Sequence, residues 1–327
     1  MKKQIKIKIC DTHFTGEHLY NNKYTKLLSQ KYDLVFSDDP DYILFSVFGN
    51  ENTKYTDEKY IKIFFTEEDL SPDFNLCDYA IGFDYLDYGD RYIRFPLAFA
   101  HFQLSKAMEK HLITDEDLAM KTGFCDFVVS NGGADNIREK MFRKLSEYKR
   151  VDSGGRFLNN VGGPVGSKLD FQKNHRFSLT FENGSSIGYT TEKIVDAFAA
   201  KTIPIYWGNP DIAKDFNPGS FINYHDYNDP DKLVERVIEV DQNEELYIKM
   251  LKTPIFANGQ IPKQYRFETL LDFFVHIFEQ PVEKASRRCH TSFRGGYIFE
   301  KFRYGKFTEC YEKDLLLRAY NKIKHFR

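Results

Sequence analysis

Residues 176–207 read RFSLTFENGSSIGYTTEKIVDAFAAKTIPIYW, and this stretch decides the class of fold. Two segments with strand patterns, residues 176–181 and 202–207, flank a helical pattern at residues 191–201. A strand, a helix and a second strand in this order predict two parallel strands joined by a right-handed crossover. The loop at residues 182–189 contains two glycines and leads into the helix. Because free N–H groups at a helix start favour negative charge, this loop predicts an anion site.

Apolar runs of the same kind recur elsewhere in the chain, and they are typical of a parallel sheet buried on both faces. The other expected strands are residues 6–10, 33–36, 42–48, 61–66, 79–83 and 124–130. Helical spacing of apolar side chains predicts further helices at residues 135–150, 231–241 and 266–278. The sequence therefore predicts an α/β protein with two units, residues 1–120 and 121–283, followed by a basic helical tail at residues 284–327.

The composition excludes several classes of protein. Of the 327 residues, 42% are hydrophobic and 29% are charged, which fits a globular protein with a sizeable core and not a disordered chain. No run approaches the roughly 20 apolar residues that a membrane-spanning helix needs. The five cysteines include no CxxC pair, which argues against a disulfide framework or a structural zinc site. Lys and Ile alternate near the start of the chain, as in a strand and not a signal peptide, so we expect a cytoplasmic protein.

The charge is unevenly distributed along the chain. Residues 284–327 contain twelve basic and four acidic side chains, although the whole chain has a formal net charge of -2. Residues 1–283 are therefore acidic overall. A basic tail of this kind favours an anionic partner such as a membrane surface or another polyanion. Docking of the tail on the acidic remainder of its own chain explains the pattern equally well.

Charged side chains occupy the places where a fold of this class binds ligands. Glu192 and Lys193 follow the glycine-bearing loop, where a carboxylate can accept from ribose hydroxyls and an ammonium group can bind phosphate. Arg138, early in the helix expected at residues 135–150, can offer a bidentate guanidinium to a leaving diphosphate. Spacing alone leaves a structural role open for all three, with Glu192 complementing the helix dipole and the two cations solvated.

Two acidic stretches are candidates for other chemistry. Three consecutive carboxylates, Glu67, Glu68 and Asp69, follow the expected strand 61–66. In a cleft without water their repulsion raises the pKa of at least one, which suits a general base, whereas in water they form only a solvated turn. Asp39 and Asp41 form a D-x-D pair, but they precede a strand and do not follow one, so no metal site is expected there.

Several longer motifs, in order, resemble one family. FEN (181–183), GYTTEKIVDAF (188–198) and TIPIYWGNPDIAKDFNPGSFIN (202–223) are similar to the hallmark region of the α-1,3-fucosyltransferases, the bacterial branch in particular. FFTEED (64–69), CDYAIGFDYLDYGDRYIR (77–94) and FCDFVVSN (124–131) match in the same order, and the resemblance covers most of residues 61–278. It implies the GT-B fold, in which two Rossmann-like domains face a cleft. It also implies transfer of L-fucose from GDP-fucose with inversion, in a single displacement.

The resemblance implies roles for individual residues. By position, Glu68 would be the catalytic base that takes the proton of the acceptor hydroxyl. The GDP-fucose site would consist of Arg138 and Lys193 at the phosphates, Glu192 at the ribose, and Asn183 and Tyr189 around the nucleotide. The chain departs from the family pattern in having Glu67 and Asp69 on either side of the base, where Gly and Asn are usual. It also has no heptad repeats before the basic tail, so dimerisation through heptads is not expected.

From this resemblance we expect fucosylation of the 3-hydroxyl of GlcNAc in N-acetyllactosamine-type ends of a surface polysaccharide or lipopolysaccharide precursor, giving a Lewis-x-type product. The enzyme would be cytoplasmic and peripheral at the inner membrane face. No tightly bound metal is expected, and Mn²⁺ or Mg²⁺ would stimulate only through the nucleotide. The alternatives are a GT-B transferase that uses another GDP-sugar, and a non-catalytic glycan- or polyanion-binding protein. Nucleic acid is not an expected partner, because residues 1–283 are acidic overall and contain no recognisable nucleic-acid-binding motif.

Overall fold

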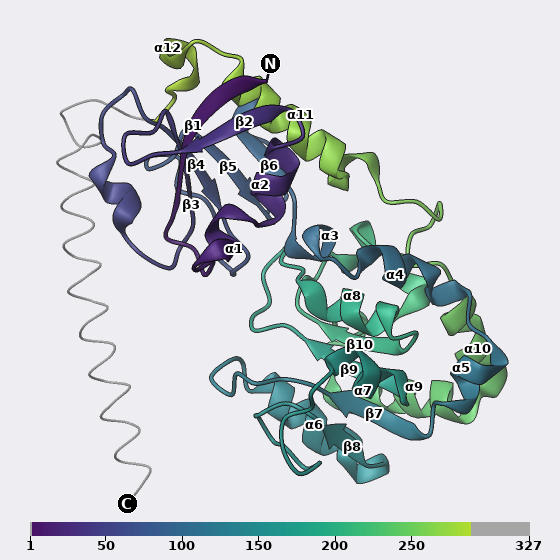
Figure 1. Ribbon diagram of the computed structural model, residues 1–327. Helices are drawn as coiled ribbons and strands as arrows, with labels where there is room; N and C mark the ends of the chain where they lie inside the picture. The colour runs from purple at the N-terminus through teal and green to yellow at the C-terminus, as the bar shows by residue number, and fades with distance from the viewer. Residues whose placement is uncertain (1, 289–327) are drawn as a thin grey trace, which may run out of the picture. The chain divides into compact units, whose positions relative to one another are not determined.

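The computed structural model describes residues 2–288, and it divides this part of the chain into two compact α/β units (Figure 1). Unit 1 contains the chain up to Gly82, then Asp87–Ile93, and then the chain from Leu270 onward. Unit 2 contains Phe83–Leu86 and Arg94–Thr269. Almost all of the basic tail expected at residues 284–327 lies outside the described residues.

The two units do not follow the predicted division at residues 120 and 283. The chain passes into unit 2 at Arg94 and returns to unit 1 at Leu270. The return is made by helix α11 (Phe267–Phe278), whose apolar face packs on unit 1. The ring of Phe278 lies 4.4 Å from that of Tyr42 and 5.4 Å from that of Tyr32. The apolar spacing of this segment predicts a helix, but it does not say which of the two sheets the helix covers.

Unit 1 is built on a six-stranded sheet with the order β2-β1-β3-β4-β5-β6. The strands are β1 (Lys3–Cys10), β2 (Tyr32–Phe36), β3 (Tyr42–Phe45), β4 (Ile61–Phe65), β5 (Tyr79–Gly82) and β6 (Tyr92–Arg94). Neighbouring strands from β2 to β5 pair in parallel, as their apolar runs predict. The helices of this unit are α1 (Glu17–Tyr20), α2 (Lys23–Leu28), α11 and α12 (Val282–Ala285), with short 3-10 turns at Glu51–Lys54 and Gly89–Arg91.

Unit 2 is built on a five-stranded parallel sheet with the order β11-β10-β9-β7-β8. The strands are β7 (Gly123–Phe127), β8 (Val151–Ser153), β9 (His175–Phe181), β10 (Ile203–Trp207) and β11 (Ile222–Asn223). The helices are α3 (Leu97–Ala100), α4 (Leu104–Met108), α5 (Asp115–Ala119), α6 (Ile137–Tyr148), α7 (Lys168–Lys173), α8 (Glu192–Ala199), α9 (Pro230–Gln242) and α10 (Glu244–Lys252). Short 3-10 turns occupy Glu109–His111, Ile212–Lys214, Pro218–Ser220, Tyr224–Asp226 and Lys263–Tyr265.

The predicted strand–helix–strand unit is confirmed as β9, α8 and β10. β9 and β10 pair in parallel, with Phe177 opposite Ile203. Helix α8 buries Ile194, Val195 and Phe198 completely, which ties it to the core of unit 2. Since strands of one parallel sheet end at one edge, the loops after β7, β9 and β10 gather at the carboxyl edge of this sheet.

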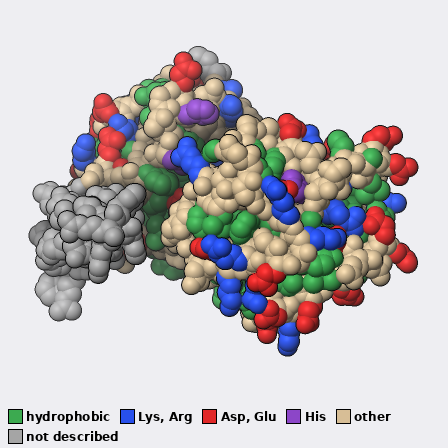
Figure 2. Space-filling model, turned by 90° about the horizontal axis from the view of Figure 1, so that it is seen from below, with side chains coloured by type: hydrophobic (Ala, Val, Ile, Leu, Met, Phe, Trp, Pro, Cys, Tyr) green, Lys and Arg blue, Asp and Glu red, His purple; other side chains and the backbone are tan. Residues whose placement is uncertain are grey.

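Charge is mixed on the surface of the described residues. On the face drawn in Figure 2, acidic and basic side chains are interspersed with apolar ones. None of the helices within residues 2–288 is both long and apolar enough to cross a membrane. The predicted interaction of the tail with an anionic partner concerns residues that lie almost entirely beyond Arg288.

Candidate active site

Arg138 is a buried cation with an unfilled hydrogen-bonding position. It lies in the first turn of α6, after the loop that follows β7, and only 1% of it is exposed. Its Nη1 donates to Asn183 Oδ1 at 3.0 Å and its Nη2 to the carbonyl of Asn131 at 2.9 Å, whereas its Nε has no partner among the described residues. Burial lowers the pKa of Arg138, although the charge of Glu182 opposes the effect. Within residues 2–288 no carboxylate forms an ion pair with it, and both oxygens that accept from it belong to neutral groups.

The second predicted cation, Lys193, lies at the start of α8 between two carboxylates. Its Nζ lies 3.0 Å from Glu182 and 3.3 Å from Glu192. Burial by itself would lower the pKa of Lys193, but the charges of these two carboxylates raise it. The pKa of Glu192 is lowered, because Lys193 and Lys168 outweigh the opposing effect of burial. Lys193 is therefore a charge held in place by two carboxylates.

Glu182, which is not among the predicted site residues, lies between the two cations in the site: its carboxylate pairs with Lys193, and the residue after it contacts Arg138. It directly follows β9, is fully buried, and accepts from the N–H and the hydroxyl of Thr191 at 2.8 and 2.6 Å. Burial raises the pKa of Glu182, which Lys193 and the Thr191 bonds oppose. The next residue, Asn183, holds Arg138. The signal in the sequence was an acidic residue that directly follows a strand with alternating apolar side chains.

The glycine-bearing loop is held in one conformation. Gly188 has a φ of 92°, and a Cβ at this position would lie 2.3 Å from the carbonyl oxygen of Phe83, so only glycine fits. Its N–H donates to Asn209 Oδ1 at 2.7 Å. Tyr189 is buried, and its ring meets the edge of Phe83 at 5.2 Å. Tyr189 is thus a buried side chain that packs beside the glycine-bearing loop.

A buried ion pair between Arg94 and Asp215 supports the glycine-bearing loop, and the sequence pattern does not predict it. Arg94 grips Asp215 with two bonds of 2.7 Å, one from each terminal nitrogen. The same guanidinium donates to the carbonyls of Gly188 at 3.0 Å and Phe83 at 2.6 Å. Arg94 stands in the RYIR motif, but nothing in that motif points to a partner 121 residues away.

Glu68 lies in unit 1, directly after β4. The hydroxyl of Thr66 accepts from the Glu68 N–H at 3.0 Å and donates to the Glu68 carbonyl at 3.1 Å, which fixes the turn. Its neighbour Glu67 forms an ion pair with Lys23 and lies 3.7 Å from His13. No hydrogen bond or ion pair within residues 2–288 engages the carboxylate of Glu68. Of these two adjacent carboxylates, Glu67 is paired with a cation, whereas Glu68 is not paired within residues 2–288.

The structure brings five of the six predicted site residues together in unit 2 and places the sixth in unit 1. The five surround the ends of β7 and β9 and the start of α8, and they are Arg138, Asn183, Tyr189, Glu192 and Lys193. Glu68 stands at the carboxyl edge of the other sheet. Unit 2 thus offers buried positive charge and acceptors for hydroxyl groups, and unit 1 offers a carboxylate.

The D-x-D pair, at which no metal site is expected, has its first carboxylate engaged by neighbouring side chains. Asp39 Oδ1 lies 3.0 Å from Lys59 Nζ and 3.3 Å from the hydroxyl of Tyr60. Within the described part of the chain no group of three His, Cys, Asp or Glu side chains is arranged to hold a metal ion. The described cysteines Cys10, Cys77 and Cys125 are buried free thiols.

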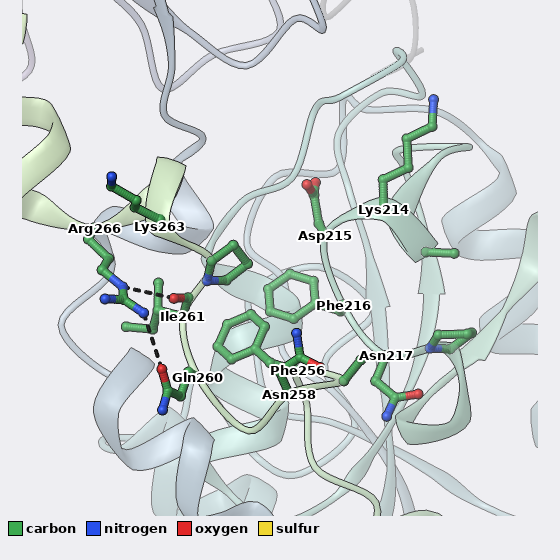
Figure 3. A pocket seen from close by; sticks show the side chains of 14 residues that line it. Lys214, Asp215, Phe216, Asn217, Phe256, Asn258, Gln260, Ile261, Lys263 and Arg266 are labelled. Carbon is green, nitrogen blue, oxygen red and sulfur yellow. Dashed lines mark hydrogen bonds between the residues drawn. The ribbon is translucent and has the colours of Figure 1, made fainter.

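A cavity of about 310 Å³ lies elsewhere in unit 2 (Figure 3). Phe216 and Phe256 stand on its wall, and Arg266 bridges the carbonyl of Ile261 and the side chain of Gln260. None of the six predicted site residues lines it. The cavity is therefore separate from the charged cluster at the ends of β7 and β9.

Two family models match the chain. Residues 7–101 match the alpha-(1,3)-fucosyltransferase FucT N-terminal domain, and residues 118–253 match the C-terminal model of glycosyltransferase family 10 (fucosyltransferase). An alpha-(1,3)-fucosyltransferase FucT from Helicobacter pylori is 36% identical over 294 residues, which cover 77% of this chain and 61% of the relative. The human 4-galactosyl-N-acetylglucosaminide 3-alpha-L-fucosyltransferase 9 is 32% identical over 126 residues, or 37% of this chain and 34% of its own. The chain thus spans about three fifths of the length of the bacterial relative.

Solved structures agree with the fold. A crystal structure of an α1,3-fucosyltransferase is similar with a TM-score of 0.74 and 30% identity, covering 86% of this chain and 92% of that one. A crystal structure of an α1,3-fucosyltransferase with GDP-fucose gives a TM-score of 0.73 at the same identity. Together with the two parallel-sheet units, these similarities confirm the predicted GT-B class of fold.

Proposed function

This chain belongs to the fucosyltransferases of glycosyltransferase family 10, and from this premise we propose that it transfers L-fucose from GDP-fucose to the 3-hydroxyl of GlcNAc in N-acetyllactosamine-type glycans. The observation that carries the proposal is the buried guanidinium of Arg138, which has an unpartnered Nε and no carboxylate paired with it within residues 2–288. A buried charge of this kind is stable only with a counterion. The diphosphate of GDP-fucose supplies one.

The donor site consists of the charged cluster in unit 2. Arg138 and Lys193 bind the phosphates, and they stabilise the negative charge that builds up on GDP as it leaves. Glu192, whose lowered pKa keeps it ionised, accepts from the ribose hydroxyls. Asn183 orients Arg138, and Tyr189 closes the pocket next to the nucleotide. Since Arg138 and Lys193 stand at the diphosphate, we expect transfer without a bound divalent ion, and Mn²⁺ or Mg²⁺ acts only through the nucleotide.

The chemical step is a single displacement with Glu68 as the base. The carboxylate of Glu68 takes the proton from the 3-hydroxyl of the acceptor as that oxygen forms a bond to the anomeric carbon of fucose. The bond between this carbon and the diphosphate oxygen breaks at the same time, and its electron pair leaves with GDP. Attack from the face opposite the leaving group inverts the anomeric centre. The pairing of Glu67 with Lys23 leaves Glu68 as the free carboxylate at this position.

The cellular setting follows from the expected acceptor. We propose a cytoplasmic enzyme at the inner membrane face that builds Lewis-x-type ends on lipopolysaccharide or surface-polysaccharide precursors, with the basic tail attracted to anionic lipid. Removing residues 311–327 should lower binding to anionic liposomes at low salt. Unchanged binding would show that the tail serves another purpose, such as docking on the acidic body.

The function is tested by measuring GDP release from GDP-fucose, with and without N-acetyllactosamine, for the wild type and for Glu68→Gln. Acceptor-dependent release that is lost in the variant, with GDP binding retained, supports the transferase and its base. Competition by GDP-mannose tests the alternative of another GDP-sugar donor. GDP-fucose binding without release for any glycan would favour the non-catalytic alternative.

A further inference from the structure

Two aromatic side chains are exposed at the carboxyl edge of the unit 1 sheet, although side chains of this kind are usually buried. Phe48 follows β3 and is 49% exposed, and His13 follows β1 with 48% of its side chain exposed. Their rings meet edge to face at 5.7 Å. Phe14, on the other side of His13, continues the row with a ring 4.5 Å away and leads to the buried ring of Phe65 at 6.2 Å.

This row of rings lies next to the proposed catalytic base. β3 stands between β1 and β4 in the sheet, so the loops that follow these three strands are neighbours at one edge. His13 Nε2 lies 3.7 Å from Glu67 Oε2, one residue before Glu68. Phe65, the last residue of β4, is three residues before Glu68. A ligand on the ring pair of His13 and Phe48 would therefore lie beside Glu67, in the loop that also carries Glu68.

The loop that presents the two rings is built around a strained residue. Asp11 has a φ of 54°, which is uncommon for a residue other than glycine. Its carboxylate accepts from the N–H groups of Glu51 and Asn52 at 2.7 and 2.8 Å, and its carbonyl accepts from the Phe48 N–H at 2.8 Å. Backbone strain of this kind persists where the surroundings impose it, and it often marks a functional site. Asp11 thus fixes the loop of Phe48 against the loop of His13.

We infer that His13 and Phe48 form the subsite that binds the neutral pyranose of the acceptor next to the attacking hydroxyl, with Asp11 as a positioning residue. The inference rests on the proposed function, because it identifies the acceptor side of the same reaction. A neutral hexose has one face of C–H groups, which packs on aromatic rings and gains from the removal of apolar area from water. The two rings contact each other and Asp11 fixes the loop of Phe48, so we expect little side-chain freedom to be lost when a ligand binds.

The test measures initial rates against N-acetyllactosamine concentration at saturating GDP-fucose for His13→Ala and Phe48→Ala. Each variant should raise the acceptor KM about tenfold and leave the KM for GDP-fucose and kcat within about twofold, as expected for a lost binding contact. Phe48→Trp should restore a low acceptor KM because it keeps a ring there. Asp11→Ala should raise the same KM, since the loop that carries Phe48 loses its support.

A matched control lies in the same unit. Phe36 on β2 is 37% exposed, and its ring meets that of Tyr20 edge to face at 4.8 Å, but β1 and β3 separate its strand from β4. Phe36→Ala should leave the acceptor KM unchanged. If all three alanine variants raised it equally, the effect would be one of general stability and the subsite would be refuted.

Titration of N-acetyllactosamine into the GDP-saturated protein separates this inference from the proposed function. Transfer by the wild type with an unchanged acceptor KM in both alanine variants overturns the subsite alone. Binding of the glycan that both variants lose, without any transfer by the wild type, overturns the transferase and supports the subsite. Neither binding nor transfer by the wild type overturns both.

Discussion

Arg138 Nη1 donates to Asn183 Oδ1 at 3.0 Å and thereby joins the first turn of α6 to the loop after β9. Asn183 follows Glu182, whose carboxylate holds Lys193 at 3.0 Å. Two neighbouring residues at the end of one strand thus fix the two cations of the site, each from a different helix.

Replacing Arg138 should abolish the stabilisation by ligand without lowering the stability of the free protein. Arg138→Met removes a buried charge that has no carboxylate partner within residues 2–288, so we expect little or no loss of stability without nucleotide. The stabilisation by GDP-fucose, about 2.7 kcal/mol at a hundred times Kd, should disappear. Thermal unfolding with and without GDP-fucose measures both quantities. Arg143→Met on the same helix, where Arg143 pairs with Glu139 at the surface, is the control and should keep the ligand response. A wild-type response in Arg138→Met would rule out a phosphate-binding role.

Breaking the pair of Arg94 and Asp215 should destabilise unit 2. The side chain of Asp215 is fully buried and that of Arg94 is 10% exposed, so Arg94→Ala leaves a carboxylate without its partner. The expected cost is about 3–5 kcal/mol in urea unfolding. The exposed pair of Lys214 and Asp211 provides the comparison, because Lys214→Ala should change stability by an amount within experimental error. Equal effects of the two substitutions would contradict the supporting role of Arg94.

Lys110 should make stability depend on pH. Its Nζ donates to the carbonyls of Met250 and Leu251 at the end of α10, and burial lowers its pKa from 10.5 to about 7. Between pH 7 and 10.5 the unfolded chain therefore binds a proton that the folded chain lacks, and stability rises with pH. Below pH 7 both states are protonated at this group, and the contribution is constant.

Lys110→Met should lower this slope by at most about 1.4 kcal/mol per pH unit, and the part that comes from Lys121, whose pKa burial also lowers to about 7, should remain. Urea unfolding at several values between pH 7 and 10 measures it. Lys252→Met, at an exposed position of α10, should keep the wild-type slope. Identical slopes for the wild type and Lys110→Met would mean that Lys110 stays charged in the folded protein, held by the carbonyls of the helix end.

The sequence predicts the parts of the fold that depend on local pattern. β9, α8 and β10 are predictable because apolar side chains alternate along β9, recur at helical spacing in α8 and run almost unbroken along β10. β8 and β11, with three and two residues, are too short to give a pattern, and they form because β7 and β10 offer them an edge. The return of α11 to unit 1 depends on contacts with Tyr32 and Tyr42, which are far away in sequence.

The site residues divide in the same way, into those that the local sequence predicts and those that depend on distant contacts. Spacing and family resemblance point to Arg138, Glu192 and Lys193, because each stands at the start of a helix after a strand. The partners that fix them are not visible in this way. Glu182 is an acidic residue at the end of a strand in which apolar and polar side chains alternate, and Asp215 meets Arg94 across 121 residues of chain. Which neighbour holds a charged side chain is decided by tertiary packing, and not by spacing along the chain.

The neighbouring carboxylates Glu67 and Glu68 should differ sharply in their effect on transfer. Glu67 is held by Lys23, whereas the described residues leave the carboxylate of Glu68 unpaired. Glu68→Gln removes the proton acceptor, so kcat should fall by about 10²–10⁴ with little change in GDP-fucose affinity. Glu67→Gln should lower kcat far less, because it loses only an ion pair beside the site. Rates of acceptor-dependent GDP release for the two variants decide the matter, since a larger loss in Glu67→Gln would assign the base to Glu67.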